Sequence, residues 1–115
     1  MNKLFLGCCE GYSESNIIDF IVNVFQVAKE EISCYEFYVA VNEQEDYEGS
    51  AYFLMKHRET GEFYEASGSH CSCDGFEGQW GPKIAPKAYL TSNHYSTYCY
   101  YNNDKIKEFV KKLFD

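Results

Sequence analysis

The sequence predicts an α+β fold in which two amphipathic helices pack on an antiparallel sheet of three to five strands. Two observations lead to this fold class. Apolar residues recur at helical spacing near both ends of the chain, and strand-type patterns fill the middle. The chain has 115 residues, of which 45% are hydrophobic, and this is enough to build one buried core. We therefore expect a single compact domain over residues 1–115.

The first predicted helix spans roughly residues 15–31. Ser13 or Ser15 can accept a hydrogen bond from a free backbone N–H at its start. The apolar positions that recur at helical spacing are Ile17, Ile21, Val24, Phe25 and Ala28. Polar residues occupy the opposite side, so we expect this helix to cover one face of the sheet.

Three segments have the patterns of adjacent antiparallel strands. Residues 35–41 alternate, which places on one face Tyr35, Phe37, Val39 and Val41. After a polar loop, residues 50–57 are apolar on both faces, as is typical of a central strand. A turn with Gly61 at its end then leads into the partner strand, residues 62–66.

Another strand and the second helix are predicted after Pro82 and Pro86. Residues 95–101 are rich in tyrosine and in other residues that favour strands. Asp104 is placed to cap the closing helix. The apolar stripe of this helix consists of Ile106, Phe109, Val110 and Leu113.

The charge balance restricts the kind of partner. Eighteen acidic and ten basic residues give a net charge of −8, which disfavours nucleic acid and anionic membranes because both need lysine and arginine contacts. Eleven tyrosines exceed what a small core can bury with every hydroxyl bonded, so we expect some on the surface. The candidate partner-binding residues are Glu43, Glu45, Asp46, Tyr47 and Glu48. The alternative for this run is a solvated connection between strands.

The six cysteines and the N-terminal segment bear on the cellular compartment in which the protein is expected. Residues 1–6 lack the apolar run of a signal peptide, and no stretch approaches the roughly 20 apolar residues of a membrane helix. We therefore expect a protein of the host cell cytosol, where thiols stay reduced. The spacing of Cys8 with Cys9 and of Cys71 with Cys73 also makes a poor disulfide framework. We therefore interpret the cysteines as free thiols or, alternatively, as metal ligands.

Residues 68–80 hold the densest chemistry in the sequence, with two thiols, an imidazole and the only tryptophan. His70, Cys71 and Cys73 have side chains that bind zinc, and other cysteines or histidines would have to complete the site. The same groups are those of thiol catalysis, in which a histidine acts as base. The structural alternative is a tight loop in which both cysteines pack as small apolar side chains.

The same segment suggests a ligand pocket as a further alternative. Phe76 and Trp80 offer stacking faces, and the Gln79 amide can read the edge of a base. A pocket of this kind would sequester a nucleotide signal. Against it stands the interpretation that Trp80 anchors the core and that Gly68, Gly75 and Gly78 serve turns.

The segment Gly-Ser-His-Cys-Ser-Cys-Asp-Gly-Phe-Glu-Gly-Gln-Trp, residues 68–80, resembles a stretch in a group of short proteins of bacteria and their phages. Asp74 stands where that group has an aromatic residue, and the chain after Trp80 diverges. The group has no assigned activity, so the resemblance implies a context and not a reaction. In size and charge the chain is similar to small acidic phage proteins of the anti-CRISPR type, which inhibit host defence.

These observations favour a non-enzymatic binding protein over an enzyme. The expected function is that of a phage or mobile-element inhibitor of a host defence system. Its acidic, tyrosine-rich surface would occupy a basic nucleic-acid-binding site on a host protein, since carboxylates can stand where phosphates would bind. The zinc or thiol site and the nucleotide pocket stay open as alternatives.

Overall fold

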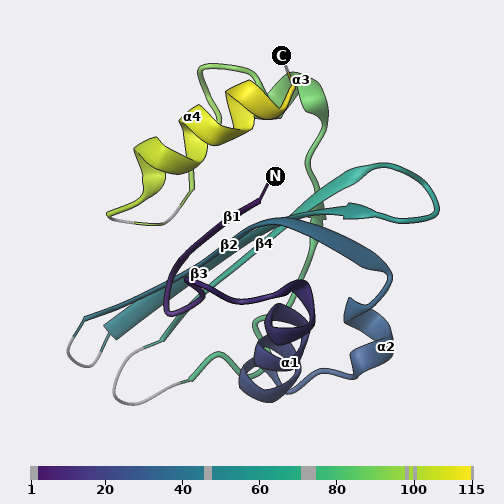
Figure 1. Cartoon of the computed structure of the whole chain (residues 1–115), viewed down its shortest axis with the longest axis vertical. Helices are drawn as coiled ribbons and strands as arrows, with labels where there is room; N and C mark the ends of the chain where they lie inside the picture. Colours follow the sequence, from purple (N-terminus) through teal and green to yellow (C-terminus); the bar gives the residue numbers. More distant parts are fainter. Residues whose placement is uncertain (1–2, 46–47, 71–74, 98, 100, 115) are drawn as a thin grey trace.

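The computed structural model describes residues 3–45, 48–70, 75–97, 99 and 101–114. The elements in chain order are β1 Leu4–Gly7, α1 Glu14–Phe25, α2 Lys29–Ile32, β2 Tyr35–Glu45, β3 Glu48–His57, β4 Phe63–His70, β5 Lys83–Ile84, α3 Lys87–Leu90 and α4 Asn103–Leu113. A five-stranded sheet lies between α1 and α2 on one side and α3 and α4 on the other (Figure 1). The predicted α+β class is confirmed.

The sheet is mixed, with spatial order β1-β2-β3-β4-β5. β1 pairs with β2 in parallel, whereas the other neighbours are antiparallel. The chain passes through α1 and α2 between the first two strands, and a crossover of this kind returns it in the same direction. The prediction of a purely antiparallel sheet was therefore wrong for β1, an edge strand that was not predicted. The short strand β5 was not predicted either.

β3 is the central strand, as predicted, and both of its faces are buried. Phe53 and Met55 face α1, and Tyr52 and Leu54 face the α4 side. Burial of one large apolar side chain stabilises the fold by about 1.5–3 kcal/mol. A strand of this composition therefore requires a covering layer on each face.

β2 contains a β-bulge at Tyr38. Phe37 pairs with Met55 and Val39 with Leu54, so two steps along β2 match one step along β3. Because side chains alternate between faces, the additional residue reverses the alternation. The bulge divides the four residues that were predicted to share a face: Tyr35 and Phe37 pack on the α1 side, and Val39 and Val41 on the α4 side. That prediction was wrong.

The first helix is shorter than predicted. Ser13 caps it as expected, because its hydroxyl accepts from the Asn16 N–H while the Asn16 side chain accepts from the Ser13 N–H. The helix ends at Phe25 since Gln26 takes a left-handed conformation with φ of 59°. The remainder of the predicted helix contains a break and then the four-residue helix α2.

The predicted strand over 95–101 is not a strand at its described positions, 95–97, 99 and 101. Tyr95 lies over the face of the sheet and not along its edge, since its hydroxyl is 2.7 Å from that of Tyr52 on the central strand. α4 confirms the closing helix, with Ile106 and Val110 buried. Its N-cap residue is Asn102, however, and Asp104 lies within the first turn, so the predicted cap was wrong.

The close approach of β1 to β2 depends on Gly7. Its φ is +66°, and a Cβ atom there would lie 2.1 Å from the backbone oxygen of Asn42. We predict that Gly7→Ala lowers the free energy of unfolding by about 2 kcal/mol more than Gly11→Ala does. Gly11 is the matched control, because its φ is +82° but a Cβ would meet nothing within 4 Å. Equal losses in urea unfolding would contradict the packing of β1 described here.

Candidate functional site

The acidic run between β2 and β3 is not a single exposed loop. β2 continues to Glu45 and β3 begins at Glu48, so most of the predicted polar loop belongs to a long hairpin. Glu48 is exposed, as a partner-binding residue would be. Asp46 and Tyr47 lie outside the described residues, as does the side chain of Glu45.

Glu43 is buried and hydrogen-bonded within the fold, which the sequence did not reveal. It is only 8% exposed, and its Oε2 accepts hydrogen bonds from the Tyr101 N–H at 3.0 Å and from Asn102 Nδ2 at 2.7 Å. Asn102 is the residue at which α4 begins. A buried carboxylate bonded in this way attaches the start of α4 to β2. Glu43 is therefore not part of an exposed acidic surface, contrary to expectation.

Residues 75–80 fold onto the core on the α1 side. The Phe76 ring stacks on Phe25 with a centroid distance of 5.0 Å, and it is 5% exposed. Trp80 lies edge to face against Phe25 at 5.4 Å and against Phe53 at 5.7 Å. The rings of Phe76 and Trp80 are thus both used in packing. This arrangement agrees with the alternative in which Trp80 anchors the core.

The Gln79 amide is also engaged by the protein. Its Oε1 accepts from the Ser69 N–H at 2.8 Å, and its Nε2 donates to the carbonyls of Ser69 at 2.6 Å and Gly75 at 2.8 Å. The side chain thereby satisfies backbone groups at the edge of β4 in place of a neighbouring strand. If the Gln79 amide were to hydrogen-bond a nucleobase, these bonds to the protein backbone would have to break.

The predicted metal site lies partly outside the described residues, since Cys71 and Cys73 belong to the part that is not described. His70 ends β4, with its ring 4.8 Å from that of Phe76. The described residues contain no group of three or more histidine, cysteine or acidic side chains arranged to hold a metal ion. Zinc binding by these three residues stays a prediction.

Two of the remaining cysteines are poor nucleophiles. Cys8, Cys9, Cys34 and Cys99 are free thiols, and Cys9 and Cys99 are buried. Burial, helped by the neighbouring Cys8, raises the pKa of Cys9 to about 12. Burial and the charge of Glu43 raise the pKa of Cys99 to about 12. At neutral pH both are thiols, whereas the nucleophile and the metal ligand is the thiolate.

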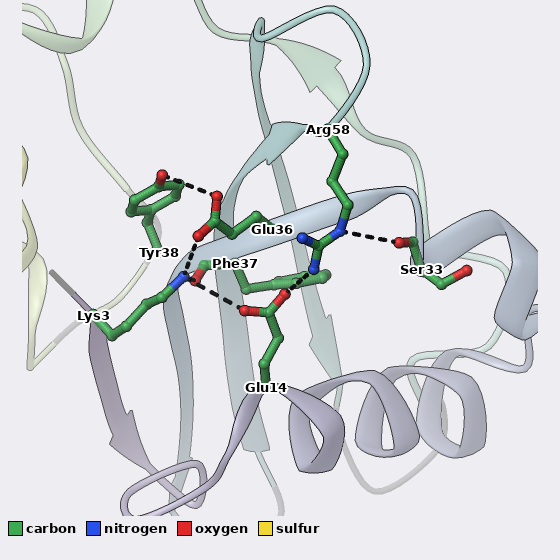
Figure 2. A network of polar contacts seen from close by, with 7 residues as sticks. All are labelled: Lys3, Glu14, Ser33, Glu36, Phe37, Tyr38 and Arg58. Atoms are coloured by element: carbon green, nitrogen blue, oxygen red, sulfur yellow. Dashed lines mark hydrogen bonds and ion pairs between the residues drawn. The ribbon is translucent and has the colours of Figure 1, made fainter. Parts of the chain in front are cut away.

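A polar network joins β1, α1, β2 and the β3–β4 hairpin (Figure 2). Lys3 Nζ reaches Glu14 at 3.5 Å and Glu36 at 3.4 Å, and Arg58 reaches Glu14 at 2.5 Å. Burial raises the pKa of Glu36, but the charge of Lys3 and hydrogen bonds from Tyr38 and Lys3 outweigh it, so the net pKa is lowered. The network neutralises these acids and holds the layers together.

Other acidic residues on the surface have no such partner. Among the described residues, ion pairs involve only the acids Glu14, Glu36 and Glu108. The exposed acids without an ion pair in that part of the chain include Glu10, Asp19, Glu30, Glu31, Glu48, Glu59, Glu62 and Glu77. Asp104, in the first turn of α4, is also exposed and without an ion pair, and the others precede β5 in the sequence.

The charge is divided unevenly along the chain. Residues 1–82 contain fifteen acidic and four basic residues, and residues 83–115 contain three acidic and six basic residues. The second segment includes β5, α3 and α4, whereas α1 and α2 lie on the opposite face of the sheet (Figure 1). Residues 10–32, named here the α1–α2 layer, contain five acidic residues and one lysine, so this layer carries a net negative charge.

The surface of α1 also carries a shallow aromatic groove. It has a volume of about 440 Å³, and its lining includes Tyr12, Asp19 and Phe20. Tyr12 is 36% exposed, and its ring meets Phe20 edge to face at 6.5 Å. Aromatic residues are enriched at the centres of protein-binding surfaces, and the rims of these surfaces are polar.

A second cavity, of about 390 Å³, lies on the opposite face beside β4 and β5. Its lining includes Tyr52, Glu65, Ser67, Lys83, Tyr89 and Ser96. The Tyr52 hydroxyl donates to Glu65 Oε1 at 2.9 Å and lies 2.7 Å from the Tyr95 hydroxyl. Burial raises the pKa of Glu65, and the Tyr52 bond and the charge of Lys83 act in the opposite direction. The sequence analysis gave Glu65 no role, although an acid at an inward position of a strand was a usable signal.

Comparison with protein-family models, with curated proteins and with solved structures finds no match to this chain. None of the helices in the described part of the chain is long and apolar enough to cross a membrane.

The different positions of Glu43 and Glu48 lead to a direct test. We predict that Glu43→Ala lowers the free energy of unfolding by about 1–3 kcal/mol, because the start of α4 loses a charged acceptor. Glu48→Ala is the matched control and should change it by less than about 0.5 kcal/mol, because Glu48 is exposed. A neutral effect of Glu43→Ala in denaturant unfolding would contradict the attachment of α4 to β2.

The raised pKa of Glu65 predicts a pH dependence of stability. A carboxyl whose pKa is higher in the folded state stabilises the fold at low pH, and this contribution is lost as the pH rises through the folded pKa. Glu65→Gln should therefore gain stability relative to the wild type between about pH 4 and about pH 7. Glu62→Gln, at an exposed position, is the control. A constant difference across this range in thermal unfolding would show that Glu65 is not desolvated.

Proposed function

We propose that this chain is a non-enzymatic binding protein whose acidic α1–α2 layer docks against a basic surface of a partner protein. The observation that carries the proposal is the excess of exposed carboxylates without an ion pair in the described part of residues 3–82. The predicted role as an inhibitor of host defence depends on the resemblance of residues 68–80 and belongs to the same proposal. Its interface, however, differs from the one expected.

Charge supports the α1–α2 layer as the docking surface. Asp19, Glu30 and Glu31 are exposed there, and none of them has an ion-pair partner among the described residues. Complementary charge accelerates the encounter of two proteins and excludes partners of like charge. The lysines of α4 lie on the other side of the sheet, so the molecule would approach a basic surface in one orientation.

The aromatic groove supports the same layer. Buried aromatic rings supply most of the binding energy in many interfaces, and charged residues at the rim supply orientation. Tyr12 and Phe20 have this central position, with Asp19 in the same groove and Glu10 near Tyr12 in the sequence. Glu43 of the β2–β3 hairpin does not belong to this docking surface, because its carboxylate is hydrogen-bonded to the start of α4.

The test compares two variants of equal net charge. The first removes three charges from the acidic layer, Asp19→Asn, Glu30→Gln and Glu31→Gln, and the second removes three elsewhere, Glu59→Gln, Asp104→Asn and Glu108→Gln. We predict that the first variant binds a lysine decapeptide about tenfold more weakly than the wild type at low salt, with unchanged thermal stability.

The second variant should lose less than about threefold, because the charges that it removes lie outside the acidic layer. Calorimetric titration measures both affinities. Equal losses in the two variants would show that only net charge matters, and this would contradict the proposed docking surface. Tyr12→Ala, tested with a protein partner, should then weaken binding by a further factor of about ten.

A further inference from the structure

We propose that the cavity beside β4 and β5 binds a small zwitterion of the α-amino-acid class, with its ammonium group on Glu65 and its carboxylate on Lys83. This site lies on the face opposite the α1–α2 layer and is independent of the docking function proposed above. The site combines two opposite charges, a fixed hydrogen-bond relay and a space between the charged groups.

Glu65 and Lys83 are directly paired residues of β4 and β5. Both line the cavity, and the charge of Lys83 acts on the Glu65 carboxyl. Yet the ion pairs of the described residues do not include one between them, so their charged ends are more than 4.0 Å apart. Two opposite charges separated across a cavity are complementary to a ligand that carries both charges.

A relay of two tyrosines fixes the Glu65 carboxyl. Tyr52 has one hydroxyl proton and donates it to Glu65 Oε1, so Tyr95 is the donor in the bond between the two hydroxyls. No hydrogen bond from a described residue reaches Glu65 Oε2. One oxygen is thereby held in position, and the other is available for a ligand donor.

The remaining lining suits a small polar molecule. Ser67 and Ser96 bring hydroxyl groups, and the rings of Tyr52 and Tyr89 bring apolar surface. The volume of about 390 Å³ is within the range of small-molecule sites. A ligand ammonium would replace part of the solvation that the half-buried Glu65 carboxyl has lost, and it would give the ionised carboxylate a partner of opposite charge.

The experiment titrates the folded chain with the common free L-amino acids and records calorimetric heat and amide chemical shifts. We expect at least one of them to bind and to shift the amide signals of Ser67 and Lys83 but not those of α1. Its N-acetyl and carboxamide derivatives, each of which lacks one charge, should bind at least about tenfold more weakly.

Glu65→Gln and Lys83→Gln should each lower the affinity at least about tenfold. Glu62→Gln and Lys87→Gln are the matched controls, because neither residue lines the cavity, and they should leave the affinity unchanged. Glu65→Gln keeps an acceptor for Tyr52, so the fold is preserved. Binding should also strengthen from about pH 4 to about pH 7 as Glu65 ionises, with Lys83, Tyr52, Tyr89 and Tyr95 as its titratable neighbours.

Three results would overturn the proposal. The first is that no amino acid binds the intact chain. The second is that the N-acetyl derivative binds as tightly as the free amino acid, which would indicate an anion site at Lys83 alone. The third is that Glu65→Gln binds with unchanged affinity, which would remove the carboxyl from the site.

Discussion

The burial of β3 on both faces is the constraint on which the rest of the structure depends. Phe53 and Met55 require a cover on one side, and Tyr52 and Leu54 require one on the other. Helix α1 supplies the first cover, and the segment from α3 to α4 supplies the second (Figure 1). The bulge at Tyr38 lets β2 serve both cores, because it moves Phe37 and Val39 to opposite faces.

Two separate layers allow the surface charge to be divided. The α1–α2 layer contains five acidic residues and one lysine, and four lysines lie on α4. Within this arrangement, some acids stabilise the fold, while most of the exposed acids in the described part of the chain have no ion pair. Glu43 holds the start of α4, and Glu14 and Glu36 attach α1 to the sheet through Lys3 and Arg58 (Figure 2).

Local patterns in the sequence predicted the elements better than their arrangement. The apolar stripe of α1, the Ser13 cap and the two-sided β3 depend on neighbouring residues, and periodicity reveals them. The bulge at Tyr38 and the break at Gln26 are single-residue events that leave the composition unchanged. The parallel pairing of β1 depends on contacts distant in the sequence, which periodicity does not contain.

The candidate site residues were predicted less well, for a physical reason. An acid in a polar run has the same sequence pattern whether it faces solvent, as Glu48 does, or accepts two hydrogen bonds, as Glu43 does. Phe76, Gln79 and Trp80 were recognised as special, and their contacts explain this through packing and backbone bonds. Glu65 was overlooked because its partners Tyr52 and Tyr95 come from distant segments.

The most direct test of this account is a set of methyl and aromatic nuclear Overhauser contacts from β3 and β2. The account predicts contacts from Met55 and Phe37 to α1 residues and contacts from Leu54 and Val39 to α3 or α4 residues. The two sets should not overlap. Contacts from Phe37 and Val39 to the same helix would contradict the bulge, and with it the division of the protein into an acidic and a basic layer.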